Sequence, residues 1–318
     1  MTEAPRLRLL VLVGPTGVGK TAVAVRLAGQ VAMEVVSADS RQVYRGMDIG
    51  TGKPTAEERV AVPHHLLDIV DPDQRYHAAR FRAEALVAVA AIHERGHLPV
   101  VVGGTGLYVR ALLKGLAPAP PADPALRQEL EAFATAHGAP ALHARLAAVA
   151  PGVARRLHPN DRVRVVRALE VHARGGGEPR DPGAGDWAAA PSTWRLVMIG
   201  LGRDRAALNA ALAERARTMV ARGMMDEVRR LLEAGYDPER PPMDGIGYRH
   251  FALAIQARMT AEQALRLMIR DTTRYAKRQM TWFGRDPEIR WLDVDGAGGV
   301  EGAAETVHKH ITQEGLIE

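Results

Sequence analysis

The segment Gly14-Pro15-Thr16-Gly17-Val18-Gly19-Lys20-Thr21 matches the phosphate-loop pattern G-x-x-x-x-G-K-[ST] without a gap. It follows an apolar run at residues 8–13 and precedes a helical pattern at residues 20–28, which is the strand–loop–helix context that this pattern requires. Glycines let backbone N–H groups turn toward a phosphate, and the helix N-terminus adds positive potential. We therefore predict a bound di- or triphosphate such as ATP, with Lys20 as a cation and Thr21 as a hydroxyl ligand for Mg²⁺. A glycine-rich turn without this function would not require Lys and Thr at those two places.

Strand-like and helical segments alternate through the first third of the chain. Strand-like runs lie at residues 34–37, 66–70 and 98–102, and a helical pattern covers residues 78–94. A strand-like run at residues 195–200 resumes this pattern later. The remaining expected elements are helices at residues 205–222, 225–234, 248–257 and 260–283 and a strand at residues 289–294. The alternation predicts an α/β fold, a P-loop NTPase-like core with a parallel sheet and helices on both faces.

A Pro-rich connector at residues 117–124 interrupts this alternation. Helical patterns follow at residues 125–137, 141–150 and 161–173, and residues 175–191 are rich in Gly and Pro, as in a loop. We therefore predict a catalytic core with C-terminal helices, formed by residues 1–116 and 196–318. Residues 117–195 are expected to form an inserted helical domain.

Composition limits the functional classes. The 318 residues include no Cys, 47% are hydrophobic and 25% are charged, which indicates a globular protein without disulfides or thiolate chemistry. We find no signal peptide or membrane-spanning segment and expect a cytoplasmic protein that does not bind membranes. The net charge of +5 is by itself weak evidence for nucleic-acid binding. His64 and His65 are adjacent, point opposite ways on an extended segment and have no third ligand, so we expect no zinc site.

The sequence lacks the signatures of hydrolytic nucleotide-binding proteins. The apolar run at residues 99–102 ends in Gly103-Gly104-Thr105 rather than in an acidic pair, and no N-K-x-D guanine signature is present. This favours group transfer to a ligand over motor hydrolysis.

Two polar residues follow strand ends that should face the phosphate loop. In open α/β sheets, ligands bind beyond the carboxyl ends of the strands, where Asp39 and Thr105 are expected. Asp39 could accept a proton or hold a metal through water, and its alternative role is that of a helix-capping or turn aspartate. For Thr105, a helix-cap role and a site role are equally supported by the residues alone.

Two helical segments carry stripes of arginine. Residues 155–167 contain five Arg and one Asp, and Arg266, Arg270, Arg274, Lys277 and Arg278 recur at helical spacing on the last long helix. Either stripe alone is more typical of a solvated helix side with partners such as Glu170 and Asp271. Together in a phosphate-loop protein without a motor strand, they favour a polyanionic substrate.

A set of ordered motifs resembles the bacterial tRNA dimethylallyltransferases, the tRNA isopentenyltransferase family. The motifs are the phosphate loop, Asp39-Ser40 with Gln42 and Tyr44, the segment at residues 46–54, Gly103-Gly104-Thr105-Gly106-Leu107-Tyr108, His158-Pro159-Asn160-Asp161, Gly247-Tyr248-Arg249 and Lys277-Arg278-Gln279-Met280-Thr281-Trp282. The resemblance runs from the first strand to the last long helix. It implies that dimethylallyl diphosphate donates its five-carbon group to N6 of the adenosine just 3′ of the tRNA anticodon, releasing diphosphate.

The resemblance also implies roles for individual residues. The phosphate loop would hold the diphosphate leaving group with Lys20, Thr21 and Mg²⁺, and Asp39 would remove the proton of the adenine amine. The base would be brought out of the anticodon stack, as in other base-modifying enzymes. Thr105 and Arg215 would complete the catalytic set, with Arg215 bonding the diphosphate; Arg217 is the alternative for that assignment.

The resemblance further assigns contacts with the tRNA anticodon stem-loop. The residues are Asp39, Ser40, Arg41, Gln42, Thr105, Arg127, Val163, Arg164, Val165, Val166, Arg167, Asp244, Gly245, Ile246, Gly247, Tyr248, Arg249, Lys277, Arg278, Gln279, Met280, Thr281, Trp282, Phe283 and Gly284. Asp244 is acidic in a segment expected to face RNA, so its contacts would be to sugar or base. Trp282 and Phe283, at the end of the last long helix, are otherwise more typical of core residues than of a base-stacking pair. We expect the protein to act as a monomer.

Two other functions remain as alternatives. A small-molecule kinase would use Asp39 as the base for an acceptor hydroxyl and would turn over ATP without RNA. A nucleic-acid-binding ATPase is compatible with the arginine stripes but is disfavoured by the missing acidic strand end.

Overall fold

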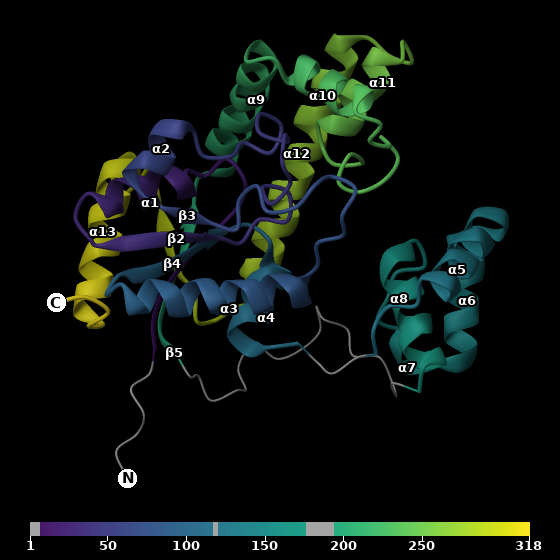
Figure 1. Cartoon of the computed structure of the whole chain (residues 1–318), viewed down its shortest axis with the longest axis horizontal. Coiled ribbons are helices and arrows are strands. Elements are labelled where there is room, and N and C mark those ends of the chain that lie inside the picture. The colour runs from purple at the N-terminus through teal and green to yellow at the C-terminus, as the bar shows by residue number, and fades with distance from the viewer. Residues whose placement is uncertain (1–6, 117–119, 176–193) are drawn as a thin grey trace. The chain divides into compact units, whose positions relative to one another are not determined.

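Six parallel strands form one sheet in the order β3-β2-β4-β1-β5-β6 (Figure 1). The computed structural model describes residues 7–116, 120–175 and 194–318. The strands are β1 (Leu7–Val13), β2 (Met33–Ser37), β3 (His64–His65), β4 (Leu98–Gly103), β5 (Trp194–Gly202) and β6 (Arg290–Asp293). The helices of the core are α1 (Lys20–Ala28), α2 (Ala56–Ala61), α3 (Ala78–Glu94), α4 (Gly106–Lys114), α9 (Arg205–Ala221), α10 (Met224–Glu233), α11 (Tyr248–Ile255), α12 (Ala261–Phe283) and α13 (Gly299–Gln313).

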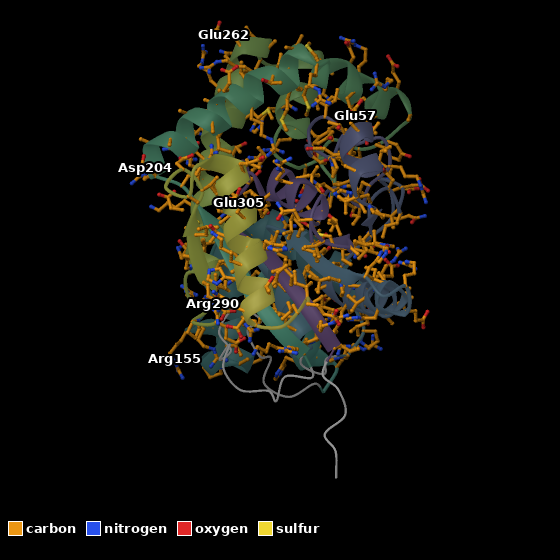
Figure 2. All side chains as sticks on the ribbon, turned by 90° about the vertical axis from the view of Figure 1, so that its left-hand side faces the viewer. Glu57, Arg155, Asp204, Glu262, Arg290 and Glu305 are labelled. Carbon is orange, nitrogen blue, oxygen red and sulfur yellow. The ribbon has the colours of Figure 1, made fainter. Side chains whose placement is uncertain are left out.

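Helices cover both faces of the sheet, which confirms the predicted α/β fold. In β1, Leu10 and Leu12 pack on one face with α1 and α13, while Leu9 and Val11 pack on the other face with α3 and α4. All four side chains are buried, as expected for a parallel strand covered on both sides. The exposed side of α13 carries Glu305, which lies on the outside of the ribbon in Figure 2.

The helices α9 to α12 form a further hydrophobic cluster with the segment that follows β2. Buried side chains of this cluster include Tyr44, Met47, Met224, Tyr248 and Phe251. The long helix α12 begins in a capping box, in which Thr260 accepts from the backbone of Gln263, and extends to α4 and the sheet (Figure 1). This arrangement brings residues from the last third of the chain to the ends of β1, β2 and β4.

The chain divides into two units. Met1–Gly115 and Ala190–Glu318 form one, and Leu116–Ala189 form the other. The second unit contains α5 (Pro124–His137), α6 (Ala139–Val149), α7 (Pro151–Ala154) and α8 (Arg162–Ala173). Its own core is built around Leu142, Leu146 and Val165, which are fully buried. Residues 176–191 of the expected Gly- and Pro-rich loop, and residues 117–119 of the connector, lie outside the described residues.

One predicted strand is wrong, and four of the described helices were not predicted. Residues 66–70 do not form a strand, because Leu66 and Asp68 adopt left-handed backbone conformations (φ 62° and 55°); the sheet is extended instead at His64–His65. Helices α2, α4, α7 and α13 were not expected from the sequence. Across the described ranges, no helix combines the length and apolar character needed to span a bilayer.

Candidate active site at the carboxyl ends of the strands

The phosphate loop connects β1 to α1, as predicted. Gly14, Gly17 and Gly19 have positive φ angles of 142°, 78° and 105°, which glycine adopts without steric cost. Two of them also permit close approaches: a Cβ on Gly14 would lie 2.4 Å from the carbonyl oxygen of Leu201 in β5, and one on Gly17 would lie 2.5 Å from Leu212 in α9. The loop therefore depends on glycine for its turn and for its packing between β5 and α9.

Two cations lie beside the loop. The Lys20 ammonium donates hydrogen bonds to the carbonyl oxygens of Gly14 (2.9 Å) and Pro15 (2.8 Å). Burial lowers the pKa of Lys20 to about 7; the negative charge of Asp39 opposes this shift, and the positive charge of Arg215 adds to it. Burial also lowers the pKa of Arg215, again opposed by Asp39. A pair of cations removed from water, with one carboxylate near both, makes this site suited to an anion.

The structure separates Arg215 from the alternative Arg217. Arg215 lies one helical turn after Leu212 on α9, on the side that faces the phosphate loop. A Cβ on Gly52 would lie 1.8 Å from Nη2 of Arg215, so the guanidinium packs directly on that glycine. Arg217 is exposed and pairs with Glu214 at 3.2 Å. Of these two arginines, only Arg215 thus lies beside Lys20 and the phosphate loop.

Asp39 and Thr105 are brought together at the ends of β2 and β4. Oδ1 of Asp39 accepts hydrogen bonds from the backbone N–H groups of Arg41 (2.8 Å) and Gln42 (3.2 Å), which fixes the carboxyl group in a turn. The hydroxyl oxygen of Thr105 accepts from the backbone N–H of Ser40 at 3.1 Å. Asp39 thus has the turn role that the sequence offered as an alternative, and it also lies within the electrostatic reach of Lys20.

Helix α12 contributes a residue that sequence analysis gave no role. The phenol of Tyr275 lies close to the side chain of Thr105. Burial raises the pKa of Tyr275 to about 12, and the negative charge of Asp39 adds to the shift. The phenol therefore stays protonated at neutral pH beside the two residues at the ends of β2 and β4.

The predicted tRNA residues of α12 divide between its surface and its buried side. Lys277, Arg278, Thr281 and Gly284 are exposed, and Met280 and Trp282 are partly buried. Gln279 and Phe283 are buried, at 6% and 0% exposure. In this conformation only the exposed and the partly buried residues of this set are placed to meet a large ligand directly.

The segment at residues 244–249 is tied to the rest of the site by charged groups. Asp244 pairs with Arg41 at 3.4 Å, which explains an acidic residue in this segment, and Gly245 packs beside the same arginine. Tyr248 is buried, whereas Arg249 is exposed and pairs with Asp271. Gly247 starts α11 with φ 90°, and Ile246 is partly buried.

Glu227 is a buried residue that sequence analysis missed. Its carboxylate accepts hydrogen bonds from the backbone N–H groups of Asp48, Ile49 and Gly50 and from the hydroxyl of Tyr248, at 2.7–3.0 Å. This carboxylate fixes the segment that carries Gly52, against which Arg215 packs. No local pattern signals the role, because the partners lie far apart in the sequence.

The inserted unit has its own arginine network. Glu170, fully buried, pairs with Arg127 and with Arg167 (3.5 Å), and Arg167 also donates to the carbonyl oxygen of Pro120 (2.7 Å). Arg164 is more exposed and pairs with Asp161 at 3.3 Å. Of the neighbouring predicted tRNA residues, Val165 and Val166 are buried and Val163 is 81% exposed. Val163 and Arg164 are thus the exposed residues among those of α8 that were predicted to contact tRNA.

The protein supplies few metal ligands near the loop. Within the described part of the chain, no three His, Asp or Glu side chains gather where they could hold a metal ion. Thr21 lies at the start of α1, directly after Lys20. One hydroxyl fits a Mg²⁺ ion that takes most of its ligands from phosphate oxygens and water.

The fold and the site define a phosphate-loop α/β protein in which two buried cations, Lys20 and Arg215, lie near the carboxylate of Asp39. A family model described as IPP transferase matches residues 42–286, and the chain belongs to this family. The tRNA dimethylallyltransferase of Syntrophobacter fumaroxidans is 47% identical over 92% of this chain and 86% of its own length.

Solved structures agree with this assignment. The full-length tRNA isopentenylpyrophosphate transferase of Bacillus halodurans is 39% identical, with a TM-score of 0.70 over 97% of this chain and 98% of that one. A eukaryotic dimethylallyltransferase, described as acting on tRNA, is 27% identical, with a TM-score of 0.79 over 96% of this chain and 79% of that one. The match confirms the predicted P-loop NTPase-like fold class and the predicted family.

Proposed function

We propose that this enzyme transfers the dimethylallyl group of dimethylallyl diphosphate to N6 of the adenosine adjacent to the 3′ side of a tRNA anticodon. One observation carries this proposal: Lys20 and Arg215 are held beside a glycine-rich loop, with Asp39 near both. The names of the relatives supply the class of donor and acceptor. An enzyme that modifies tRNA is expected to work in the cytoplasm, where tRNA is found.

In the proposed reaction, one set of residues stabilises the negative charge of the leaving diphosphate, and a different residue accepts the proton of the adenine amine. The allylic C–O bond of the donor breaks, and its electron pair goes to the diphosphate, which Lys20, Arg215 and the N–H groups of the loop stabilise. A C–N bond forms between the allylic carbon and N6 of adenine. N6 loses one proton to Asp39, because the amine lone pair is delocalised into the ring and attack is easier as the proton leaves. The products are modified tRNA and diphosphate.

Asp39 is suited to this role by its hydrogen bonds. Oδ1 is occupied by the N–H groups of the turn, and no hydrogen bond joins Oδ2 to another residue in the described ranges. One oxygen thus fixes the orientation of the carboxylate while the other remains available to a proton donor. Thr105, which lies beside the same turn, lines the position of the reacting base.

Mg²⁺ is proposed to be held by the hydroxyl of Thr21 together with diphosphate oxygens. When bound, the ion neutralises charge on the leaving group. The contacts with tRNA are proposed to come from exposed cationic groups, chiefly Arg164, Lys277, Arg278 and Arg249. A target adenosine would be flipped out of the anticodon stack before reaction.

The decisive experiment uses donors with different labels. The protein is incubated with labelled dimethylallyl diphosphate or with ATP labelled at the γ-phosphate, each with and without tRNA. We expect label in RNA from the isoprenoid donor only, and no label transfer from ATP. Consumption of ATP in the absence of RNA would instead support the small-molecule kinase hypothesis, which the family assignment does not favour.

A further inference from the structure

Gln279 joins the phosphate loop to the end of β4. Its side-chain carbonyl accepts a hydrogen bond from the backbone N–H of Thr16 (2.8 Å), and its side-chain NH₂ donates to the carbonyl oxygen of Gly104 (2.8 Å). Gln279 is only 6% exposed, so neither interaction competes strongly with water. The buried amide thus hydrogen-bonds to the backbone of two separate loops, one at Thr16 and one at Gly104, and acts as a spacer between them.

The surrounding residues are shaped to admit this amide. A Cβ on Gly104 would lie 2.1 Å from the side-chain nitrogen of Gln279, so the absence of a side chain at position 104 makes room for the hydrogen bond. A Cβ on Gly106 would lie 2.0 Å from Nε1 of Trp282. Tyr275, Gln279 and Trp282 are spaced four and three residues apart, and the first contacts Thr105. Side chains on one side of α12 therefore pack against each of the three residues of the turn at residues 104–106.

The spacer connects the two halves of the proposed reaction. Thr16 belongs to the loop that holds the diphosphate, and Gly104 directly precedes Thr105, whose hydroxyl binds the backbone beside Asp39. Strands β1 and β4 are neighbours in the sheet, but their hydrogen bonding ends at Val13 and Gly103. Beyond that point Gln279 supplies a side-chain connection from the loop to this turn.

We infer that Gln279 is a positioning residue that sets the separation between the diphosphate site and Asp39, rather than a residue that contacts RNA. The inference rests on the proposed function, since it assigns Gln279 a part in the same reaction. Lys277 and Arg278, its neighbours in the sequence, project from the exposed side of the helix and are the residues available to a polyanion.

Gln279→Met tests the inference, because methionine keeps the volume but loses both hydrogen bonds. We expect affinity for dimethylallyl diphosphate, measured by calorimetry without RNA, to fall about 10-fold, because the buried groups left unpaired let the loop relax. We expect the single-turnover rate with both substrates saturating to fall by a similar factor, and the dissociation constant for tRNA to change less than 2-fold. A large loss of tRNA affinity with normal donor affinity would overturn the inference.

A second variant acts on the same contact from the other side. Gly104→Ala places a methyl group against the Gln279 amide and is expected to reproduce the effects of Gln279→Met. The double variant should be no worse than either single change, since both changes disrupt the same connection between the phosphate loop and the turn at Gly104. Leu265→Ala, far from the loop on the same helix, controls for lower stability and should leave donor affinity unchanged. Additive effects of the first two variants, or equal effects of the control, would contradict the inference.

The failure of the inference can be distinguished from the failure of the proposed function. If the wild-type protein fails to label tRNA, the proposed function is wrong. If the wild-type protein transfers normally and the variants do too, only the role of Gln279 is wrong.

Discussion

The guanidinium of Arg215 packs directly on the backbone of Gly52, where a Cβ would lie 1.8 Å from Nη2. The two residues come from α9 and from the segment that Glu227 holds by three backbone N–H groups. The position of a cation that no local sequence motif marks is thus determined by a glycine more than 160 residues earlier.

Gly52→Ala should displace this cation. The new methyl group must move Arg215 away from the diphosphate site, and loss of one charged contact is expected to weaken donor binding about 10- to 100-fold. Calorimetric titration with dimethylallyl diphosphate measures the effect. Gly96→Ala is the matched control, because Gly96 also has a left-handed backbone (φ 77° against 61°) but a Cβ there would meet no atom within 4 Å. Equal loss in both variants would show that backbone strain, not Arg215, is responsible.

Donor binding should take up a proton at alkaline pH. Burial lowers the pKa of Lys20 to about 7, so at pH 8 most of the free enzyme carries a neutral amine. Bound diphosphate favours the charged form and raises this pKa, so binding requires protonation and weakens as pH rises above 7. Calorimetry at pH 8 in buffers of different ionisation enthalpy should give an uptake of nearly one proton. Lys20→Arg should bind without this uptake, because arginine stays charged; an unchanged uptake would assign the proton to another group.

Asp39→Asn should separate catalysis from structure. Asparagine keeps the Oδ1 acceptor for the N–H groups of Arg41 and Gln42 but cannot accept the N6 proton. We expect transfer to fall by about 100-fold or more while tRNA affinity is retained. Asp204→Asn, at an aspartate that caps α9 with the same kind of backbone hydrogen bonds, should leave the rate unchanged. A turnover equal to that of the wild type would remove Asp39 from the mechanism.

Charge reversal on α8 should distinguish RNA contact from internal packing. Arg164→Glu is expected to weaken tRNA binding and to reduce the slope of log affinity against log salt by about 1. Arg167→Glu should mainly lower the free energy of unfolding, because it places a second carboxylate beside fully buried Glu170. Arg26→Glu on α1 is the control for the change in net charge. If the slope stays the same in Arg164→Glu, this side of α8 is merely solvated.

Acid should destabilise the edge of the sheet through Glu34. Hydrogen bonds from Arg95, opposed by burial and assisted by His65 and His97, lower the pKa of this carboxyl to about 2. Its contribution to stability is therefore present above pH 4.5 and is lost as pH falls toward 2. Urea unfolding between pH 6 and 3 should show a steeper loss for the wild type than for Glu34→Gln. Glu233→Gln, at an exposed residue, should follow the wild-type curve.

The phosphate loop and its flanking elements could be predicted because their signal is local: glycine spacing, an apolar run and a helical pattern. The same holds for α12, where Thr260 and Gln263 mark the start. Helix α2 has a similar signal in Thr55 and Glu58, which form a capping box that sequence analysis passed over. The strand predicted at residues 66–70 is wrong because this apolar run includes two residues with left-handed backbone conformations, which a strand does not contain.

The parts of the site that could not be predicted depend on contacts between distant segments. Gln279 stands in a motif with Lys277 and Arg278, and only tertiary structure reveals that it points toward the phosphate loop. Arg215 and Arg217 are two residues apart, and the sequence around them does not show which one faces the site. Packing against Gly52 distinguishes them.

The pairing of β1 with β5 dictates when the phosphate loop can be completed during synthesis. All seven residues of β1, from Leu7 to Val13, pair with residues that follow the inserted unit, and Gly14 packs on Leu201. A nascent chain must therefore leave β1 without this neighbour until the ribosome has made the whole insertion and the strand beyond it. Such distant pairing slows folding, and it makes the finished loop a late event even though its residues are among the first to emerge.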